Sequence, residues 1–319
     1  GVRFVHSEIQ STAYNPGSAV PVLPAPPEWQ QTSTNKDNYW LPALNVAYDL
    51  TDTMVLRFAA AKVVAWAPYN QYANNTFLND TVLTGSGGNS DLNAYESTNF
   101  NASFEWYFAR EAVVATSVFY KNIDNFIETT SGTERFFNTL SDDADQTRWN
   151  DLLATGKCST DGFCNYDVLR PRNAGNGKIK GFTVSYQQPF AHTGLGLIAS
   201  YTYADGESAA GNDLPYQSEN QISVSPYYDK GPFSARVTYS WRSDYLAGGY
   251  VAGAPPVSVD SYSDLGASLG WAFSEHFSLA FDAQNLLDEK YVQYYQTESM
   301  PANRYLTGRR YQAALQFKF

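Results

Sequence analysis

The most regular feature of this sequence is an alternation of apolar residues with polar or small ones over segments of about ten residues. The C-terminal segment carries apolar side chains at Tyr311, Ala313, Leu315, Phe317 and Phe319. Because successive side chains of a β-strand point to opposite faces, such a segment predicts a strand with one apolar and one polar face. One strand of this kind fits a packed sandwich as well as a water-filled barrel, and its repetition along the chain favours the barrel.

The repeated pattern predicts about twelve strands. They cover residues 1–11, 39–49, 54–66, 98–108, 112–130, 177–189, 194–205, 220–228, 233–245, 263–273, 277–291 and 308–319. Short turns alternate with long loops, of which 12–38, 67–97 and 131–176 are the longest. This asymmetry is typical of outer-membrane β-barrels, which have brief periplasmic turns and longer outer loops. Because the last strand follows a long loop, we expect the C-terminus on the periplasmic side.

One predicted strand departs from a simple alternation. Arg57 and Lys62 lie on opposite faces of the segment 54–66, which is otherwise mostly apolar. We therefore expect either a bulge in this strand or a charged end that reaches above the membrane.

Composition supports a single architecture along the chain. Hydrophobic residues make up 43% of the 319 residues and charged residues 17%. No apolar run approaches the roughly 18 residues that a transmembrane helix needs, and no linker or helical heptad divides the sequence. The sequence therefore predicts an all-β chain that forms a transmembrane antiparallel β-barrel.

The charge and the cysteines narrow the choice of partners. A formal net charge of −11 argues against a nucleic-acid partner, because the phosphates would be repelled. Cys158 and Cys164 are the only cysteines, and we expect them to form a loop disulfide in an oxidising compartment. A metal site would need two more ligands nearby, and no histidine lies between residues 7 and 191. We predict neither a metal site nor a cofactor.

Several short motifs, taken in order, make the chain resemble the TonB-dependent receptors of Gram-negative outer membranes. Towards the C-terminus these are Asn-Leu-Leu-Asp at 285–288 followed by Tyr291, then Gly-Arg-Arg-Tyr at 308–311 and the terminal Phe319. Earlier motifs are Leu-Pro-Ala-Leu-Asn at 41–45, Asn-Ala-Gly at 173–175, Tyr-Thr-Tyr at 201–203 and Pro-Tyr-Tyr-Asp-Lys at 226–230. They are similar to the branch of the family common in Caulobacter- and Xanthomonas-type bacteria.

The resemblance implies a 22-stranded barrel around a plug domain, of which residues 1–319 would supply the last twelve strands or so. The chain begins inside an alternating run without a signal peptide, so we expect the plug domain, the TonB box and the earlier strands to precede it. Receptors of this family bind a scarce solute and move it inward when the TonB–ExbB–ExbD complex pulls on the plug. The implied location is the outer membrane of a Gram-negative bacterium, with membrane lipids and a surface lipoprotein as further candidate partners.

Candidate solute contacts are the aromatic residues in or near the long loops, because their rings can stack on sugar rings. They are Trp29, Trp40, Trp66, Tyr69, Tyr72, Trp149, Tyr166, Tyr216 and Tyr250. Arg242 joins them, since its alternation places it on the lumen side, where it could guide a polar solute. Barrels also carry aromatic girdles and have polar lumen walls by default, so a packing role stays open for each residue.

We expect an active transporter for a carbohydrate or oligosaccharide, because the family branch is associated with sugars and the loops are aromatic and acidic. A ferric siderophore receptor and a passive twelve-stranded porin are the alternatives. An enzyme is not expected: His192 and His276 fall in short turns, and His6 has no identifiable nucleophile elbow to act with.

Overall fold

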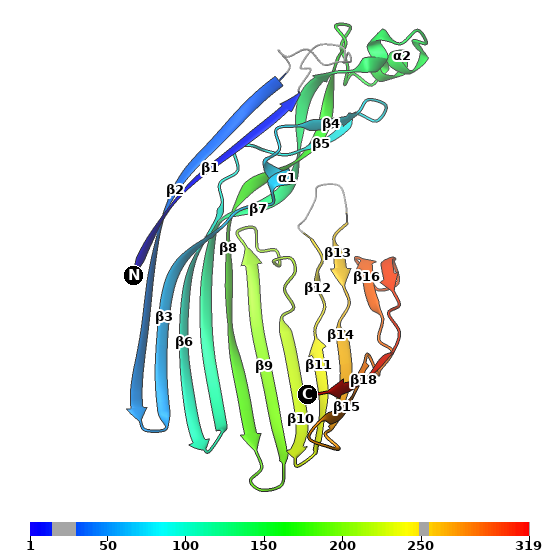
Figure 1. The fold of residues 1–319 in the computed structure, drawn as a ribbon. Helices are drawn as coiled ribbons and strands as arrows, with labels where there is room; N and C mark the ends of the chain where they lie inside the picture. Colours follow the sequence, from blue (N-terminus) through cyan, green and yellow to red (C-terminus); the bar gives the residue numbers. More distant parts are fainter. Residues whose placement is uncertain (15–29, 249–254, 319) are drawn as a thin grey trace.

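A computed structural model describes residues 1–14, 30–248 and 255–318 of the chain. Within these ranges, twelve strands pair side by side in the order β1-β2-β3-β6-β7-β8-β9-β10-β11-β14-β15-β18 (Figure 1). Their bounds are Val2–Tyr14 (β1), Gln30–Thr51 (β2), Met54–Ala65 (β3), Tyr95–Ala109 (β6), Ala112–Phe137 (β7), Phe163–Pro189 (β8), Leu195–Ser208 (β9), Asn220–Lys230 (β10), Phe233–Arg242 (β11), Tyr262–Trp271 (β14), Phe277–Gln284 (β15) and Arg310–Phe317 (β18). The predicted all-β architecture with about twelve barrel strands is confirmed.

Shorter elements occupy the segments predicted as loops. The strands β4 (Thr76–Asn79) and β5 (Thr84–Gly87) form a hairpin whose β5 runs parallel to β8. A second sheet is made of β12 (Tyr245–Leu246), β13 (Val257–Val259), β16 (Tyr291–Tyr295) and β17 (Pro301–Tyr305). The helices are α1 (Tyr69–Tyr72), α2 (Thr147–Ala154) and a 3-10 turn (Thr139–Asp142). In the part of the chain that the structure describes, none of them has the length and hydropathy needed to cross a bilayer.

Tight turns join the strands at one end of the main sheet, and the long connections gather at the other (Figure 1). The turns fall between β2 and β3, β6 and β7, β8 and β9, β10 and β11, and β14 and β15, as the alternation of connection lengths predicts. The sheet curves into a wall whose edge strands, among the described residues, are β1 and β18.

The strand register collects apolar side chains in common rows. One row across β11, β14, β15 and β18 contains Ala235, Leu269, Phe281 and Ala313. The adjacent row, on the opposite face, contains Arg236, Ser268, Asp282 and Gln312. The apolar face is open, with Leu269 54% exposed and Phe281 39% exposed. Because so large an apolar surface is unfavourable in water and marks a membrane contact, we call it the membrane-facing side and its opposite the lumen side.

Four ion pairs cross neighbouring strands on the membrane-facing side, closer to the long loops than the apolar rows. They are Lys36–Glu8 (3.1 Å), Lys62–Glu96, Lys178–Glu207 (2.9 Å) and Lys180–Asp205 (3.0 Å). Exposed ion pairs add little stability. These charged side chains nevertheless interrupt the apolar surface, which does not continue past them. We call the four pairs the charged collar and infer that it marks the edge of the membrane-embedded region.

The strand register also shows where the side chains of Arg57 and Lys62 on β3 lie. The pairing of β3 with β6 continues without a shift past Arg57 and Lys62, so the strand has no bulge there. Arg57 lies on the lumen side, and its Nε donates to Glu105 at 2.9 Å. Lys62 belongs to the charged collar, which agrees with the alternative of a charged end above the membrane.

In two of the predicted long loops the barrel strands continue, and the prediction is wrong there. β7 runs on to Phe137 and β8 begins at Phe163, so the two ends of the segment 131–176 are paired strands that extend beyond the collar (Figure 1). Likewise β1 and β2 pair through residues 12–14 and 30–38. Outside the bilayer no lipid selects an apolar face, so these strands lack the alternation by which strands are recognised.

Candidate functional site

A polar recess lies on the lumen side, where β9, β10, β11 and β14 approach the long loops. One row across these strands contains Thr202, Gln221, Arg242 and Tyr262. The row beneath contains Ser200, Ser223, Ser240 and Asp264. The recess has a volume of about 290 Å³. Since each hydroxyl can both donate and accept, this wall can hydrogen-bond a polar solute.

Arg242, predicted as a solute contact, is held by the protein itself. Its guanidinium lies 4.6 Å from the ring centre of Tyr245, 5.7 Å from that of Tyr262 and 6.0 Å from that of Tyr291. Its Nη1 also donates to the carbonyl oxygen of Asp260 at 3.1 Å. Cation–π contacts and hydrogen bonds of this kind hold the planar guanidinium in place. Arg242 therefore anchors the second sheet to β11.

A second cavity of about 310 Å³ lies between the β9–β10 connection and the second sheet. Its lining includes four acidic residues, Asp205, Asp213, Glu219 and Asp244. Asp205 is bound to Lys180 at 3.0 Å. Throughout the described ranges, no group of three or more His, Cys, Asp or Glu side chains is arranged to hold a metal ion.

Asparagine side chains fasten the segment 88–94 to the barrel wall on two sides. On β2, Asn35 Nδ2 donates to the carbonyl oxygens of Ser90 (3.1 Å) and Leu92 (2.8 Å). On β8, Asn173 accepts from the amide of Asn93 at 2.9 Å and donates to its carbonyl oxygen at 3.0 Å. This long connection is thus a bonded part of the wall.

Arg170 on β8 joins three segments at one point. Its Nε and Nη2 donate to the two carboxylate oxygens of Glu134 at 2.7 and 2.9 Å. It also donates to the carbonyl oxygen of Gly88 at 2.7 Å and to Thr76 Oγ1 at 2.6 Å. A two-point guanidinium–carboxylate contact fixes both distance and orientation, so Arg170 ties the β4–β5 hairpin to the β7–β8 hairpin.

A small apolar core sits beyond this junction. Its buried members are Leu83, Trp149, Cys164, Tyr166 and Val168, and Leu78, Phe136, Leu152, Leu153 and Cys158 pack against them. The hydroxyl of Tyr166 donates to Asp80 Oδ1 at 2.7 Å. Burial, and then the nearby Asp80 carboxylate, raise the pKa of Tyr166 far above its usual value. Its phenol stays protonated as a permanent donor to Asp80.

The structure places the predicted aromatic contacts in three different settings. Tyr72, Trp149 and Tyr166 are buried in loop cores, at 2%, 6% and 0% exposure, and offer no ring surface to a solute. Trp40 is 65% exposed but lies on the membrane-facing side, 4.9 Å from the ring of Phe4. Trp66, Tyr69 and Tyr216, which lie in the connections between barrel strands, are exposed. Trp29 and Tyr250 lie outside the described residues.

The residues that organise this region were not among the predicted site residues. They are Asn35, Asp80, Arg170 and Asn173. Asn173 lies in the Asn-Ala-Gly motif at 173–175, which is a signal that could have drawn attention to it. The other three sit in segments predicted as loops, and their partners are 36 to 95 residues away in sequence.

A disulfide joins Cys158 and Cys164 beside the ion pair of Arg135 with Asp161. The hydroxyl of Ser159 and the amide of Phe163 donate to Asp161, and together with Arg135 they hold the pKa of that carboxyl below its usual range. Because this pKa is lowered, the contacts persist above the ordinary Asp pKa and are lost as the pH falls through the lowered value.

Replacing both cysteines, Cys158→Ser with Cys164→Ser, should destabilise this loop locally by about 2 kcal/mol, because the bond closes only a short loop. Amide hydrogen exchange of residues 155–165 should rise roughly 30-fold while the barrel strands keep their protection. A reducing agent should reproduce the change in the unsubstituted protein and leave the double variant unaltered. Equal exchange in both proteins would show that the disulfide does not hold the loop.

A family model described as TonB dependent receptor-like, beta-barrel, matches residues 1–286. The probable TonB-dependent siderophore receptor PirA of Acinetobacter baumannii is 23% identical in an alignment 316 positions long, which covers 88% of this chain and 38% of that protein.

Solved structures show the same fold. The chain matches a variant of the ferric enterobactin receptor PfeA from Pseudomonas aeruginosa with a TM-score of 0.69 and 15% identity, over 100% of this chain and 50% of that one. It matches the siderophore receptor PirA from Acinetobacter baumannii with a TM-score of 0.64 and 18% identity, over 100% and 46%. The chain thus spans half or less of the length of these relatives.

Proposed function

This chain belongs to the TonB-dependent receptors through its β-barrel, and on that premise we propose that the whole protein takes up a ferric siderophore across the outer membrane. The family consists of outer-membrane transport receptors rather than enzymes. The observation that carries the choice of solute is the match over 88% of the chain to a protein described as a probable siderophore receptor.

The loop structure also reduces the support for a carbohydrate. That expectation rested on the family branch and on aromatic, acidic loops, whose rings would have to lie open for stacking. Three of the proposed rings, Tyr72, Trp149 and Tyr166, are instead interior packing residues. We propose the exposed rings of Trp66, Tyr69 and Tyr216 as solute contacts, together with the hydroxyl-rich recess on β9, β10 and β11.

We propose that residues 1–319 are the C-terminal part of a larger barrel with a plug domain. In a bilayer an unpaired strand edge leaves backbone donors and acceptors unsatisfied, at a cost of several kcal/mol each. Within the described residues β1 and β18 are such edges, which favours completion by further strands over a porin closed by these strands alone. The plug would couple to TonB–ExbB–ExbD, and the short turns and the C-terminus would face the periplasm.

Equilibrium binding to the full-length receptor tests the solute. A panel of ferric catecholates, ferric hydroxamates and oligosaccharides should yield tight binding of one ferric chelate and none of the sugars. Tyr69→Ala and Tyr216→Ala should weaken that binding about tenfold if the rings stack on the ligand, while Tyr239→Ala on the membrane-facing side should not. Selective binding of an oligosaccharide would refute the siderophore proposal in favour of sugar uptake.

A further inference from the structure

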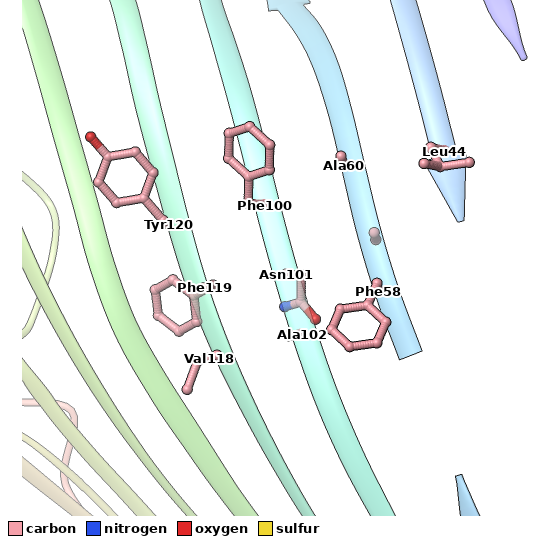
Figure 2. A pocket seen from close by; sticks show the side chains of 10 residues that line it. Leu44, Phe58, Ala60, Phe100, Asn101, Ala102, Val118, Phe119 and Tyr120 are labelled. Atoms are coloured by element: carbon pink, nitrogen blue, oxygen red, sulfur yellow. The ribbon is translucent and has the colours of Figure 1, made fainter. Parts of the chain in front are cut away.

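An apolar groove indents the membrane-facing side of β2, β3, β6 and β7 just below the charged collar (Figure 2). The small side chains of Ala60 and Ala102 lie among larger ones. The larger side chains are Leu44, Phe58, Phe100, Val118 and Tyr120. The groove has a volume of about 410 Å³, which lies in the range of roughly 300–1,000 Å³ found for small-molecule sites.

The strand register explains the shape of the groove. Ala60 pairs with Phe100, which pairs with Tyr120, and the row beneath contains Phe58, Ala102 and Val118. A small residue therefore sits beside a ring in each row, and the alanine changes strand from one row to the next. Figure 2 shows the rings of Phe100 and Tyr120 side by side on β6 and β7.

The walls of the groove are open and apolar. Phe58 is 51% exposed, Phe100 52% and Val118 53%. Asn101 and Phe119 also border the groove, but alternation along β6 and β7 points their side chains to the lumen side. An occupant would therefore meet hydrocarbon on this side of the sheet, which suits an apolar chain.

Two lysines of the charged collar border this groove at different places. Lys62 lies two residues beyond Ala60 on β3, towards the long loops. Lys180 on β8 pairs with Tyr120, so it stands beside the groove in the row of Ala60 and Phe100, three strands away from Lys62. Their side chains are 35% and 55% exposed. Each ammonium binds one carboxylate, Glu96 or Asp205. Since an ammonium has three N–H donors, each lysine can also serve a second anion.

We propose that this groove binds an acyl chain of a phosphate-bearing membrane lipid, whose phosphate is held by Lys62. The apolar groove, with Lys62 beyond it towards the long loops, follows the order of parts in a lipid standing in a bilayer leaflet. Glu96 partly neutralises Lys62, so burial of the chain contributes to affinity alongside the phosphate contact. The proposal requires only that the barrel lies in a membrane and is independent of the transported solute.

Native mass spectrometry of the full-length receptor tests this site, with dimyristoylphosphatidylglycerol as the probe and dimyristoylglycerol as the matched lipid without phosphate. The pair Ala60→Leu with Ala102→Leu fills the groove and should weaken binding of both probes at least fivefold. Lys62→Gln should weaken binding of the phosphatidylglycerol alone. Ala267→Leu, on the membrane-facing side of β14, is the matched control and should leave both unchanged.

Folding of each variant is checked by its heat-modifiable electrophoretic mobility, and Ala102→Val alone replaces the double variant if that fails to fold. Unchanged phosphatidylglycerol binding by the filled-groove variant would refute the proposed site. So would an equal loss in the Ala267→Leu control, because lipid binding would then be spread over the whole surface. Siderophore binding by the filled-groove variant should match that of the unsubstituted receptor, so this test and that of the transported solute can fail separately.

Discussion

Replacing Arg170 with alanine is expected to release the β4–β5 hairpin from β8. The change removes a two-point contact to Glu134 and the donors to Gly88 and Thr76. Breaking a fully buried ion pair costs about 3–5 kcal/mol. The side chains of Arg170 and Glu134 are 18% and 25% exposed, so solvent screening lowers the local cost to about 2–3 kcal/mol.

Amide hydrogen exchange should show this change as a rise of about 30- to 150-fold for residues 76–88, because exchange follows the local opening free energy. Arg170→Lys keeps the charge but loses the planar guanidinium. Its exchange should therefore lie between that of Arg170→Ala and that of the unsubstituted protein. Lys157→Ala, which removes a half-exposed pair with Asp167 at 3.4 Å, is the matched control and should change exchange less than about fivefold. Unaltered exchange in Arg170→Ala would mean that the strand pairing of β5 with β8 holds the hairpin without it.

The membrane-embedded wall could be predicted from the sequence because lipid imposes a local rule there. Every second residue of a spanning strand meets hydrocarbon, so Leu315 on β18 and Phe281 on β15 reveal their strands without any knowledge of their partners. The tight turns follow from the same rule, since they interrupt the alternation.

Outside the bilayer the rule no longer applies. The hairpin of β7 and β8 beyond the collar pairs Thr133 with Asp167 and Glu134 with Tyr166, and no alternation of apolar residues marks it. Its stability comes from backbone pairing and from contacts between distant segments, such as Arg170 with Thr76. Local sequence cannot show which distant segment a polar side chain will meet.

The candidate site was only partly accessible to prediction for a related reason. Aromatic residues in outer loops can face a solute or fill a small core, and the choice depends on tertiary neighbours. Tyr166 packs against Trp149 and Leu83 in such a core, whereas Tyr216 remains 74% exposed. Arg242 was placed on the lumen side by its alternation. Its partner Tyr245 lies in the same predicted strand, but Tyr262 and Tyr291 come from segments that the pattern did not connect to it.

Replacing Val237 with arginine is expected to impair assembly of the barrel in a membrane. Val237 is 43% exposed on the membrane-facing side near the middle of β11 and pairs with Ala267. A cation on the lipid face near the bilayer midplane costs about 2–4 kcal/mol. Urea unfolding of the full-length receptor in lipid vesicles should show a loss of stability of this size, and the folded fraction on unheated gels should fall with it.

Thr238→Arg is the matched control, because the neighbouring residue lies at the same depth but on the lumen side, where the chain already carries Arg236. Thr238 Oγ1 and Ser225 Oγ lie 2.9 Å apart and form a hydrogen bond. Loss of this one bond should lower the free energy of unfolding of Thr238→Arg by only about 1 kcal/mol. Both substitutions add the same charge to the same strand, so their difference measures which solvent each face meets. A larger loss for Thr238→Arg than for Val237→Arg would reverse the assignment of the two faces. The recess would then face lipid and the groove would face the lumen, so neither could bind the ligand proposed for it. The choice of a ferric siderophore would be unaffected, because it rests on the match to a siderophore receptor.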